Sequence, residues 1–196
     1  MIIQSCTRVC EKLCTKSGVC ARLGAYYYEH MVNREVELAQ IGANHRVLCV
    51  GGGRTPFTAC LLAEITGADV TVIDNDAGVI DEAQDFIASW NVMRGSLTCI
   101  CQDGRDVQNG AYDIAHIALQ VTPQMKVKER LLQTAGCRKV LCRLPVSQAD
   151  HLYPEALSRE DRKVCCGNIR HSGIRMAGET VLFTSDAQLA MDGAAV

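Results

Sequence analysis

Short apolar runs alternate with helix-like segments along most of the chain, and this alternation constrains the fold more than any other feature. Runs of strand character occur at residues 46–50, 69–74, 96–103, 112–120 and 138–145. Helical patterns fill the segments 56–65, 78–90 and about 123–134. Strands joined by helices of this length form right-handed βαβ units, so the pattern predicts a parallel sheet.

The C-terminal part of the sequence departs from this alternation. Residues 163–172 and 179–186 are strand-like, and only a turn around Gly173 to Gly178 separates them. Such a pair predicts a β-hairpin that places an antiparallel strand beside the parallel ones. The expected fold is α/β, with a doubly wound, mostly parallel seven-stranded sheet. We expect a helical lead over residues 1–42, the sheet domain over 43–186 and a flexible tail over 187–196.

The helical lead carries two expected breaks. Residues 5–40 have helical character, and Ser17-Gly18 and then Gly24 interrupt it. Glycine inside a helix costs about 1 kcal/mol relative to alanine, so each position is expected to mark a break.

The loop after the first strand, GGGRTPFTACLLA, indicates a ligand. Three glycines at 51–53 let the backbone approach a bound molecule closely. The third spaced glycine of a dinucleotide fingerprint is missing, and Pro56 stands in its place. We expect Thr55 to be the helix N-cap and Pro56 the first helical residue. With the terminal hairpin, this loop resembles that of class I S-adenosylmethionine (SAM) enzymes, whose ligand has a carboxylate and no pyrophosphate.

Two acids extend this prediction. Asp74 ends the second strand, 21 residues after Gly53, where an acid can accept hydrogen bonds from ribose hydroxyls. Asp103 ends the third strand, where SAM enzymes often place an acid against the adenine amino group. The predicted SAM-binding residues are Gly51, Gly52, Gly53, Thr55, Asp74, Asn75, Asp103, Gly104 and Gln120.

Several stretches resemble nicotianamine synthases in the same order along the chain. These are the glycine loop, AYYYEHMVNREVELAQIG before it, and YDIAHIALQV and LCRLPVSQADHLYP after it, so that the resemblance covers about residues 25–185. It implies transfer of the 3-amino-3-carboxypropyl arm of SAM to an amine, with release of 5′-methylthioadenosine.

The same resemblance implies Tyr28, Arg143 and Tyr153 as catalytic residues. A guanidinium at 143 could clamp a substrate carboxylate; the alternative is an arginine that caps a strand end or pairs with an acid. The tyrosines, with Tyr27, could line the substrate pocket or could simply pack.

The sequence departs from this family at its N-terminal side. Only about 45 residues precede the first strand, so most of the family's N-terminal helical domain, which supplies an acid, has no counterpart. Glu29, Glu35 and Glu37 are the acids near that place, and three acids on one helix are typical of a solvated face. We therefore expect a substrate side that is smaller, open, or completed by a partner subunit, as in a homodimer.

Cysteine is abundant, with twelve residues. Near the N-terminus Cys6, Cys10 and Cys14 recur at every fourth position, with Cys20 after them. Such thiols could hold zinc or an iron–sulfur cluster, but their spacing matches the usual motif of neither site. We therefore expect these cysteines to form a stripe that faces the core and binds no metal. Five others lie in apolar stretches, where reduced thiols behave as small hydrophobes: Cys49, Cys60, Cys99, Cys101 and Cys142.

The composition of the chain excludes some classes of binding partner. A net charge of −2 gives no electrostatic footprint for nucleic acid or an anionic membrane. The longest apolar runs are too short to span a bilayer, and the start lacks a secretion signal, so a cytoplasmic protein is expected. Three functions remain open for a small-molecule substrate: aminocarboxypropyl transfer, methyl transfer to a small molecule or metal cofactor, and a non-catalytic SAM-binding or thiol- and metal-sensing module.

Overall fold

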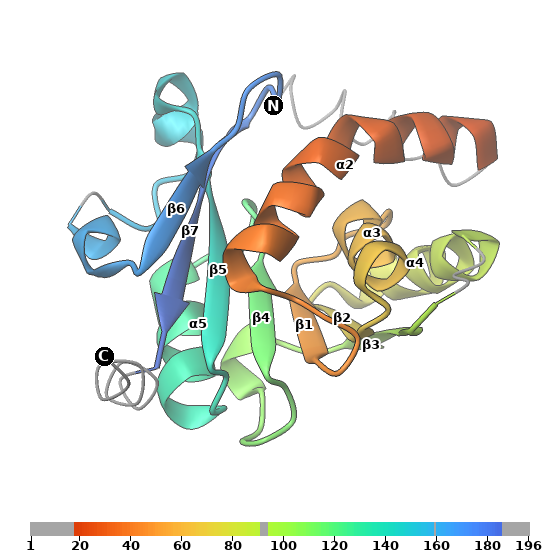
Figure 1. Cartoon of the computed structure of the whole chain (residues 1–196), viewed down its shortest axis with the longest axis horizontal. Helices are drawn as coiled ribbons and strands as arrows, with labels where there is room; N and C mark the ends of the chain where they lie inside the picture. The colour runs from red at the N-terminus through yellow and green to blue at the C-terminus, as the bar shows by residue number, and fades with distance from the viewer. Residues whose placement is uncertain (1–17, 91–93, 159, 186–196) are drawn as a thin grey trace.

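The structure is a computed structural model that describes residues 18–90, 94–158 and 160–185 (Figure 1). The helices are α2 (Gly18–Ala39), α3 (Phe57–Thr66), α4 (Ala77–Trp90) and α5 (Gln124–Glu129). The strands are β1 (Arg46–Val50), β2 (Asp69–Asp74), β3 (Ser96–Cys101), β4 (Ile114–Ile117), β5 (Lys139–Pro145), β6 (Gly167–Arg170) and β7 (Ala177–Thr184). Short helical turns are η1 (Gly104–Asp106), η2 (Arg130–Thr134), η3 (Ser147–Leu152) and η4 (Asp161–Val164).

The strands form one seven-stranded sheet in the order β3-β2-β1-β4-β5-β7-β6. Strands β1 to β5 pair in parallel, and β7 is antiparallel to both of its neighbours, β5 and β6. This confirms the predicted mostly parallel sheet with a terminal hairpin. Strand β1 lies in its interior, where Val47 pairs with Val70 on one side and with Ile114 on the other. Its apolar residues are buried, as expected for a strand that is covered on both faces.

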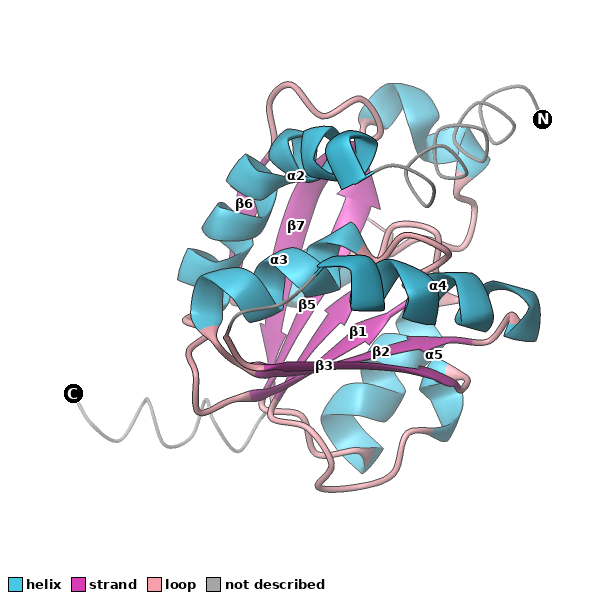
Figure 2. Cartoon of the chain, turned by 90° about the vertical axis from the view of Figure 1, so that its right-hand side faces the viewer, coloured by secondary structure: helices cyan, strands magenta, loops and turns pink. Residues whose placement is uncertain are grey.

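Helices cover both faces of the sheet. Figure 2 shows α2, α3 and α4 on one face and α5 on the other. The first core layer joins α2, α3 and α4 to the sheet around Val32, Leu62 and Phe86. The second layer packs α5 and η2 against the opposite face around Val127 and Leu131. Helix α2, which comes before the sheet in the chain, therefore shares a core with it.

The expected break at Gly24 is wrong, because α2 is continuous from Gly18 to Ala39. A Cβ atom at Gly24 would lie 2.6 Å from the ring of Phe57. The glycine therefore permits close packing of α2 on α3 and does not end a helix. The other expected break, near Ser17-Gly18, coincides with the first described residue of α2.

The start of α3 lies one residue later than predicted. The helix begins at Phe57, and Pro56 occupies the N-cap position with no side-chain cap. Thr55 is therefore not the N-cap; its side chain is buried, and its carbonyl accepts a hydrogen bond of 2.7 Å from the Phe57 amide. Proline has φ fixed but no N–H, so it can precede the first helical turn as readily as open it.

The cysteine expectation holds at four of five positions. Cys49, Cys60, Cys99 and Cys142 are buried, whereas Cys101 is exposed because it ends the edge strand β3. All the thiols in the described parts of the chain are free. Burial raises the pKa of Cys49 to about 12, so this thiol stays protonated and unreactive at neutral pH.

Within the described ranges, no helix is both long enough and apolar enough to cross a bilayer.

Candidate functional site

The glycine loop is tied to the carboxyl end of β2. The amides of Gly51 and Gly52 donate to the Ile73 carbonyl at 2.9 and 3.3 Å. The Gly53 amide donates to Oδ2 of Asp74 at 2.8 Å. The loop that follows β1 is thus hydrogen-bonded to the end of β2 and to Asp74, the acid that the sequence predicts to bind the ribose.

Two glycines of this loop have different physical roles. A Cβ atom at Gly52 would lie only 2.2 Å from Val72, so the loop approaches β2 too closely for any other residue. Gly53 has φ of +60° and no atom within 4 Å of the place of a Cβ. The backbone here faces open space, and the N-terminal turn of α3 follows. This geometry fits a ligand that approaches the main chain, as SAM would.

The predicted acids are both anchored. Asp74 is half-buried and accepts a second hydrogen bond, 3.0 Å long, from the Asp76 amide. Asp103 accepts from the backbone amide of Arg105 at 2.8 Å and from its guanidinium at 3.0 and 2.6 Å. These bonds to Arg105 lower the pKa of Asp103 to about 2, so the carboxyl is ionised at neutral pH. Asn75 is exposed, and its side chain contributes to the same lowering of the pKa.

The last two predicted SAM-binding positions differ in their surroundings. Gly104 is buried, and a Cβ atom there would meet Val127 at 2.9 Å and Val50 at 3.0 Å. The absence of a side chain at Gly104 therefore allows it to pack closely against Val50 and Val127. Gln120 is exposed in the segment after β4.

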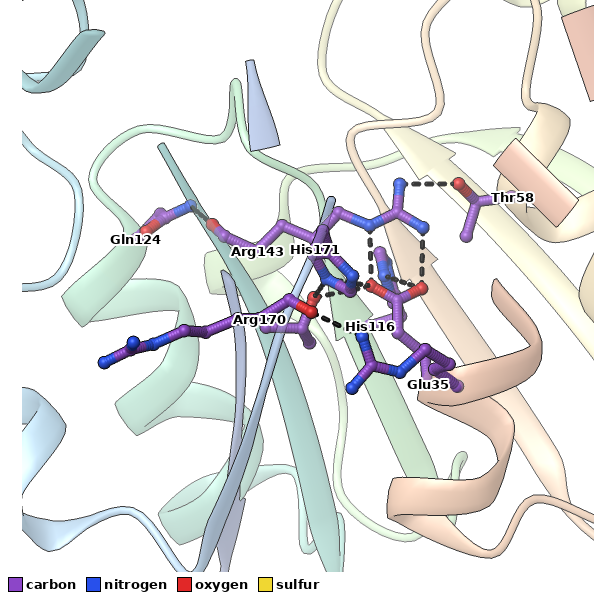
Figure 3. A network of polar contacts seen from close by, with 9 residues as sticks. Glu35, Thr58, His116, Gln124, Arg143, Arg170 and His171 are labelled. Carbon is purple, nitrogen blue, oxygen red and sulfur yellow. Dashed lines mark hydrogen bonds and ion pairs between the residues drawn. The ribbon is translucent and has the colours of Figure 1, made fainter. Parts of the chain in front are cut away.

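A buried polar cluster, which we call the Glu35 cluster, lies beneath α2 (Figure 3). It consists of Glu35 from α2, Thr58 from α3, His116 from β4, Arg143 from β5, His171 after β6 and Thr180 from β7. Arg143 donates from Nε and Nη2 to the two oxygens of Glu35 at 2.8 and 2.6 Å. Its Nη1 donates to Thr58 Oγ1 at 2.8 Å, and Thr180 Oγ1 donates to Glu35 at 2.6 Å.

The charges in this cluster compensate one another. Glu35 is fully buried, which by itself would raise its pKa, but Arg143 and His116 hold that pKa well below its usual range. The carboxylate is therefore ionised, and the sequence interpretation of residue 35 as part of a solvated face is wrong. Glu29 and Glu37 are exposed, as that interpretation requires.

Two histidines contact the same carboxylate. His116 Nε2 lies 3.4 Å and His171 Nε2 lies 3.9 Å from Glu35 oxygens. Burial lowers the pKa of both rings, and for His171 it falls to about 4. The Coulomb repulsion of Arg143 acts in the same direction on both. Both imidazoles are consequently neutral at pH 7.

A cavity of about 430 Å³ lies between α2 and the turn that joins β6 to β7. Its lining residues are Tyr26, Tyr27, His30, Met31, His171, Ser172, Gly173 and Ile174. None of these carries a carboxylate, ammonium or guanidinium group. The Tyr27 hydroxyl accepts a hydrogen bond of 2.7 Å from the Arg175 amide, which joins the helix to the turn.

The structure brings two of the three predicted catalytic residues to the start of α3. The Tyr28 ring stacks on Phe57 with centroids 5.7 Å apart, and Arg143 contacts the next residue, Thr58. Arg143 pairs with an acid, which is one of the two alternatives that the sequence left open. Tyr153 follows η3 and is half-buried, and burial raises its pKa. None of its hydrogen bonds among the described residues leads to the Glu35 cluster.

Sequence reasoning assigned Glu35 to a solvated face and missed four other members of the cluster: Thr58, His116, His171 and Thr180. One signal was available. His116 and Arg143 stand inside otherwise apolar strands, and a buried polar group needs a partner. The sequence does not reveal which partner, because residues 35, 116, 143 and 180 come from four different elements.

Metal binding finds no support in the described ranges, where no three His, Cys, Asp or Glu side chains are grouped to hold an ion. The N-terminal candidates Cys6, Cys10, Cys14 and the side chain of Cys20 lie outside the described residues. That expectation therefore stays a prediction, as does the flexible tail.

Solved structures resemble this fold. Nicotianamine synthase MtNAS in complex with MTA and tNA aligns with a TM-score of 0.73 and 18% identity, over 90% of this chain and 69% of that one. An MtNAS variant in complex with S-adenosylmethionine aligns at 0.72 and 16%, over 91% and 71%. Magnesium protoporphyrin IX methyltransferase from Synechocystis PCC 6803 with bound SAH aligns at 0.63 and 14%, over 82% and 84%.

Sequence comparison gives no such match: no protein-family model and no curated protein matches this chain. The identities to the solved structures lie below 20%, so the likeness is one of architecture. The mostly parallel seven-stranded sheet with its antiparallel β7 agrees with it. The chain therefore has the fold of the SAM-dependent methyltransferases.

Proposed function

We propose that this chain is a SAM-dependent transferase that acts on a small molecule. The single observation that carries the proposal is the hydrogen bond from the Gly53 amide to Asp74, with open space beside Gly53. The backbone of the loop after β1 and the carboxyl group of Asp74 at the end of β2 can then contact the same ligand. The comparisons support the choice of ligand, since MtNAS and the protoporphyrin methyltransferase were crystallised with SAM or SAH.

In this proposal, different residues bind different parts of SAM. The loop at 51–53 and the first turn of α3 would hold the carboxylate, Asp74 the ribose and Asp103 the adenine. When bound, SAM supplies an electrophilic carbon attached to a positively charged sulfur. The chain's own part is to align an acceptor with that carbon, because alignment supplies much of the rate in a displacement.

Aminocarboxypropyl transfer is the finer reaction that we favour. The sequence resemblance points to it, and the MtNAS structures match a larger share of this chain than the protoporphyrin methyltransferase does. One observation favours methyl transfer as a second candidate. The Arg143 guanidinium is already bound to Glu35 and Thr58, so it is not free to clamp an acceptor carboxylate.

Product analysis separates these reactions. The protein is incubated with SAM and, in parallel samples, L-glutamate, butylamine or aniline, and the nucleosides are identified by mass spectrometry. We expect methylthioadenosine if the aminocarboxypropyl arm is transferred and S-adenosylhomocysteine if the methyl group is. SAM that binds but is unchanged with every acceptor would support the non-catalytic alternative and contradict the transferase.

The Asp74→Asn substitution tests the ligand site. It preserves the shape of the side chain and one acceptor oxygen, which can still serve the Gly53 amide. It removes the acceptor for the Asp76 amide and the charge that strengthens hydrogen bonds to the ribose. We expect SAM to bind about tenfold more weakly, a loss of about 1.4 kcal/mol, measured by calorimetry. Asp76→Asn is the matched control, because in the described structure the exposed Asp76 side chain accepts only from the Gly78 amide at the start of α4. Equal affinities for SAM in the two variants would remove Asp74 from the site.

A further inference from the structure

The cavity between α2 and the β6–β7 turn lies at the edge of the sheet that carries the glycine loop. Strand β5 ends at Pro145, which pairs with Ala177 at the start of β7. The β6–β7 turn therefore sits at the carboxyl ends of the parallel strands, where open α/β sheets bind their ligands. The loop that follows β1 is at the same edge. The cavity and the glycine loop therefore share the edge of the sheet at which the parallel strands end.

His171 connects this cavity to the buried carboxylate. Its side chain is 1% exposed and forms part of the cavity wall, while Nε2 lies 2.7 Å from Thr180 Oγ1. Thr180 in turn lies 2.6 Å from Glu35 Oε1. The three residues form a hydrogen-bonded chain from the cavity to the centre of the Glu35 cluster. Figure 3 shows the two ends of this chain, His171 and Glu35.

The direction of each hydrogen bond in this chain is determined. Glu35 is ionised and can only accept, so the Thr180 hydroxyl must give it its single proton. The Thr180 oxygen must then accept from His171, which places the ring proton on Nε2. In neutral imidazole the other nitrogen, Nδ1, is left with a lone pair. No described residue donates a hydrogen bond to it.

We propose that His171, through Nδ1, accepts the proton that the acceptor molecule loses during transfer, and that the cavity holds this acceptor by an uncharged, ring-bearing part. The proposal rests on the proposed transferase function. The lone pair of the acceptor's nitrogen or oxygen forms a bond to the reacting carbon, and the C–S bond breaks with its electron pair remaining on sulfur. The attacking atom's N–H or O–H bond then releases the proton. The proton passes to Nδ1 and leaves an imidazolium that faces Glu35.

Neighbouring groups support this assignment. Glu35 cannot be the base, since Arg143 and Thr180 occupy its oxygens. His171 is faced by Glu35 and Arg34 from α2, His116 from β4 and Arg143 from β5, and His30 lines the same cavity. The cavity is lined by aromatic rings, and none of its lining residues carries a carboxylate, ammonium or guanidinium group. Such a lining favours a neutral ring of the acceptor molecule, because an ion would lose its hydration there without gaining a partner of opposite charge.

The tautomer provides a test that needs no acceptor. Two-bond ¹H–¹⁵N correlation spectra of the full chain, labelled with ¹⁵N-histidine, distinguish Nε2–H from Nδ1–H imidazole. We expect His171 as the Nε2–H form from pH 8 down to about 5. In Thr180→Val the relay is broken, and we expect a mixture of both forms. An Nδ1–H ring in the wild-type protein would overturn the proposal.

Turnover tests the role of the lone pair. With SAM and aniline, which is uncharged at neutral pH, we expect His171→Gln to lower the rate of nucleoside release about 100-fold or more while SAM affinity is unchanged. His45→Gln, at the amino end of the strands, is the matched control with the wild-type rate. Circular dichroism confirms that each variant is folded.

The outcomes distinguish the two proposals. Wild-type turnover in a folded His171→Gln variant would overturn the role of His171 and leave the transferase intact. If wild-type protein binds SAM but releases no nucleoside with aniline, butylamine or L-glutamate, the transferase fails, and with it the catalytic role of His171. The spectra would then still decide whether the hydrogen-bonded chain exists as described.

Discussion

Replacement of Arg143 by methionine is expected to lower the free energy of unfolding by about 3–5 kcal/mol. The substitution leaves the Glu35 carboxylate fully buried with no cation beside it, and it also removes the hydrogen bond to Thr58. Removing one partner of a buried ion pair costs more than the pair itself contributes, because the remaining charge has lost its hydration. Urea unfolding followed by circular dichroism measures the change.

Two further variants show whether the loss of stability comes from an unpaired buried charge. In the double variant Glu35→Leu with Arg143→Met no buried charge is left unpaired, so we expect it to recover most of the lost stability. Arg46→Met removes the guanidinium of an exposed pair with Asp113 and should have a much smaller effect. If Arg143→Met were no more destabilising than Arg46→Met, the Glu35 cluster would not be a buried ion pair in solution.

Acidification below pH 6.5 is expected to destabilise the protein. His171 takes up a proton near pH 6.5 when unfolded but only at about pH 4 when folded. Between these values the unfolded chain binds more protons, so stability is complete above pH 6.5 and decreases as the pH falls toward 4. His116 adds to the loss in the same direction, and Glu35 adds to it below pH 4.5.

For His171 alone we expect a loss of about 2 kcal/mol by pH 4, after allowance for partial solvent screening. Urea midpoints measured at intervals from pH 7.5 to 4 give the slope. His171→Asn should flatten that slope between pH 6.5 and 4, whereas His45→Gln should leave it unchanged. Parallel slopes in all three proteins would show that His171 is not buried in the neutral form.

Much of the fold follows from local sequence patterns. Period and composition predicted all seven strands and the antiparallel hairpin, because most of the strands are short runs of apolar residues bounded by turn residues. The end of β2 was predicted within a residue, so Asp74 was placed correctly at the carboxyl edge. Smaller shifts arose where one residue decides a boundary, as at Pro56.

The Glu35 cluster could not be assembled from such patterns. Periodicity assigns a face to each residue of one element, but it does not say which element covers that face. Glu35 resembles Glu37 in sequence and differs from it only because β4, β5 and β7 lie beneath α2. Gly24 illustrates the same limit, since a glycine that breaks a helix and one that admits the ring of Phe57 are identical in the sequence.

The cluster also sets an order of events during synthesis. Its contacts join residue 35 to residues 143 and 180, separations of 108 and 145 positions. On a ribosome, β1 to β4 can pair before Arg143 on β5 has been synthesised. Thr180 follows only with β7, which inserts between β5 and β6. Until then α2 would have to keep a charged carboxylate in water rather than against the sheet. We therefore expect the final docking of α2 to be a late step that follows the pairing of β7.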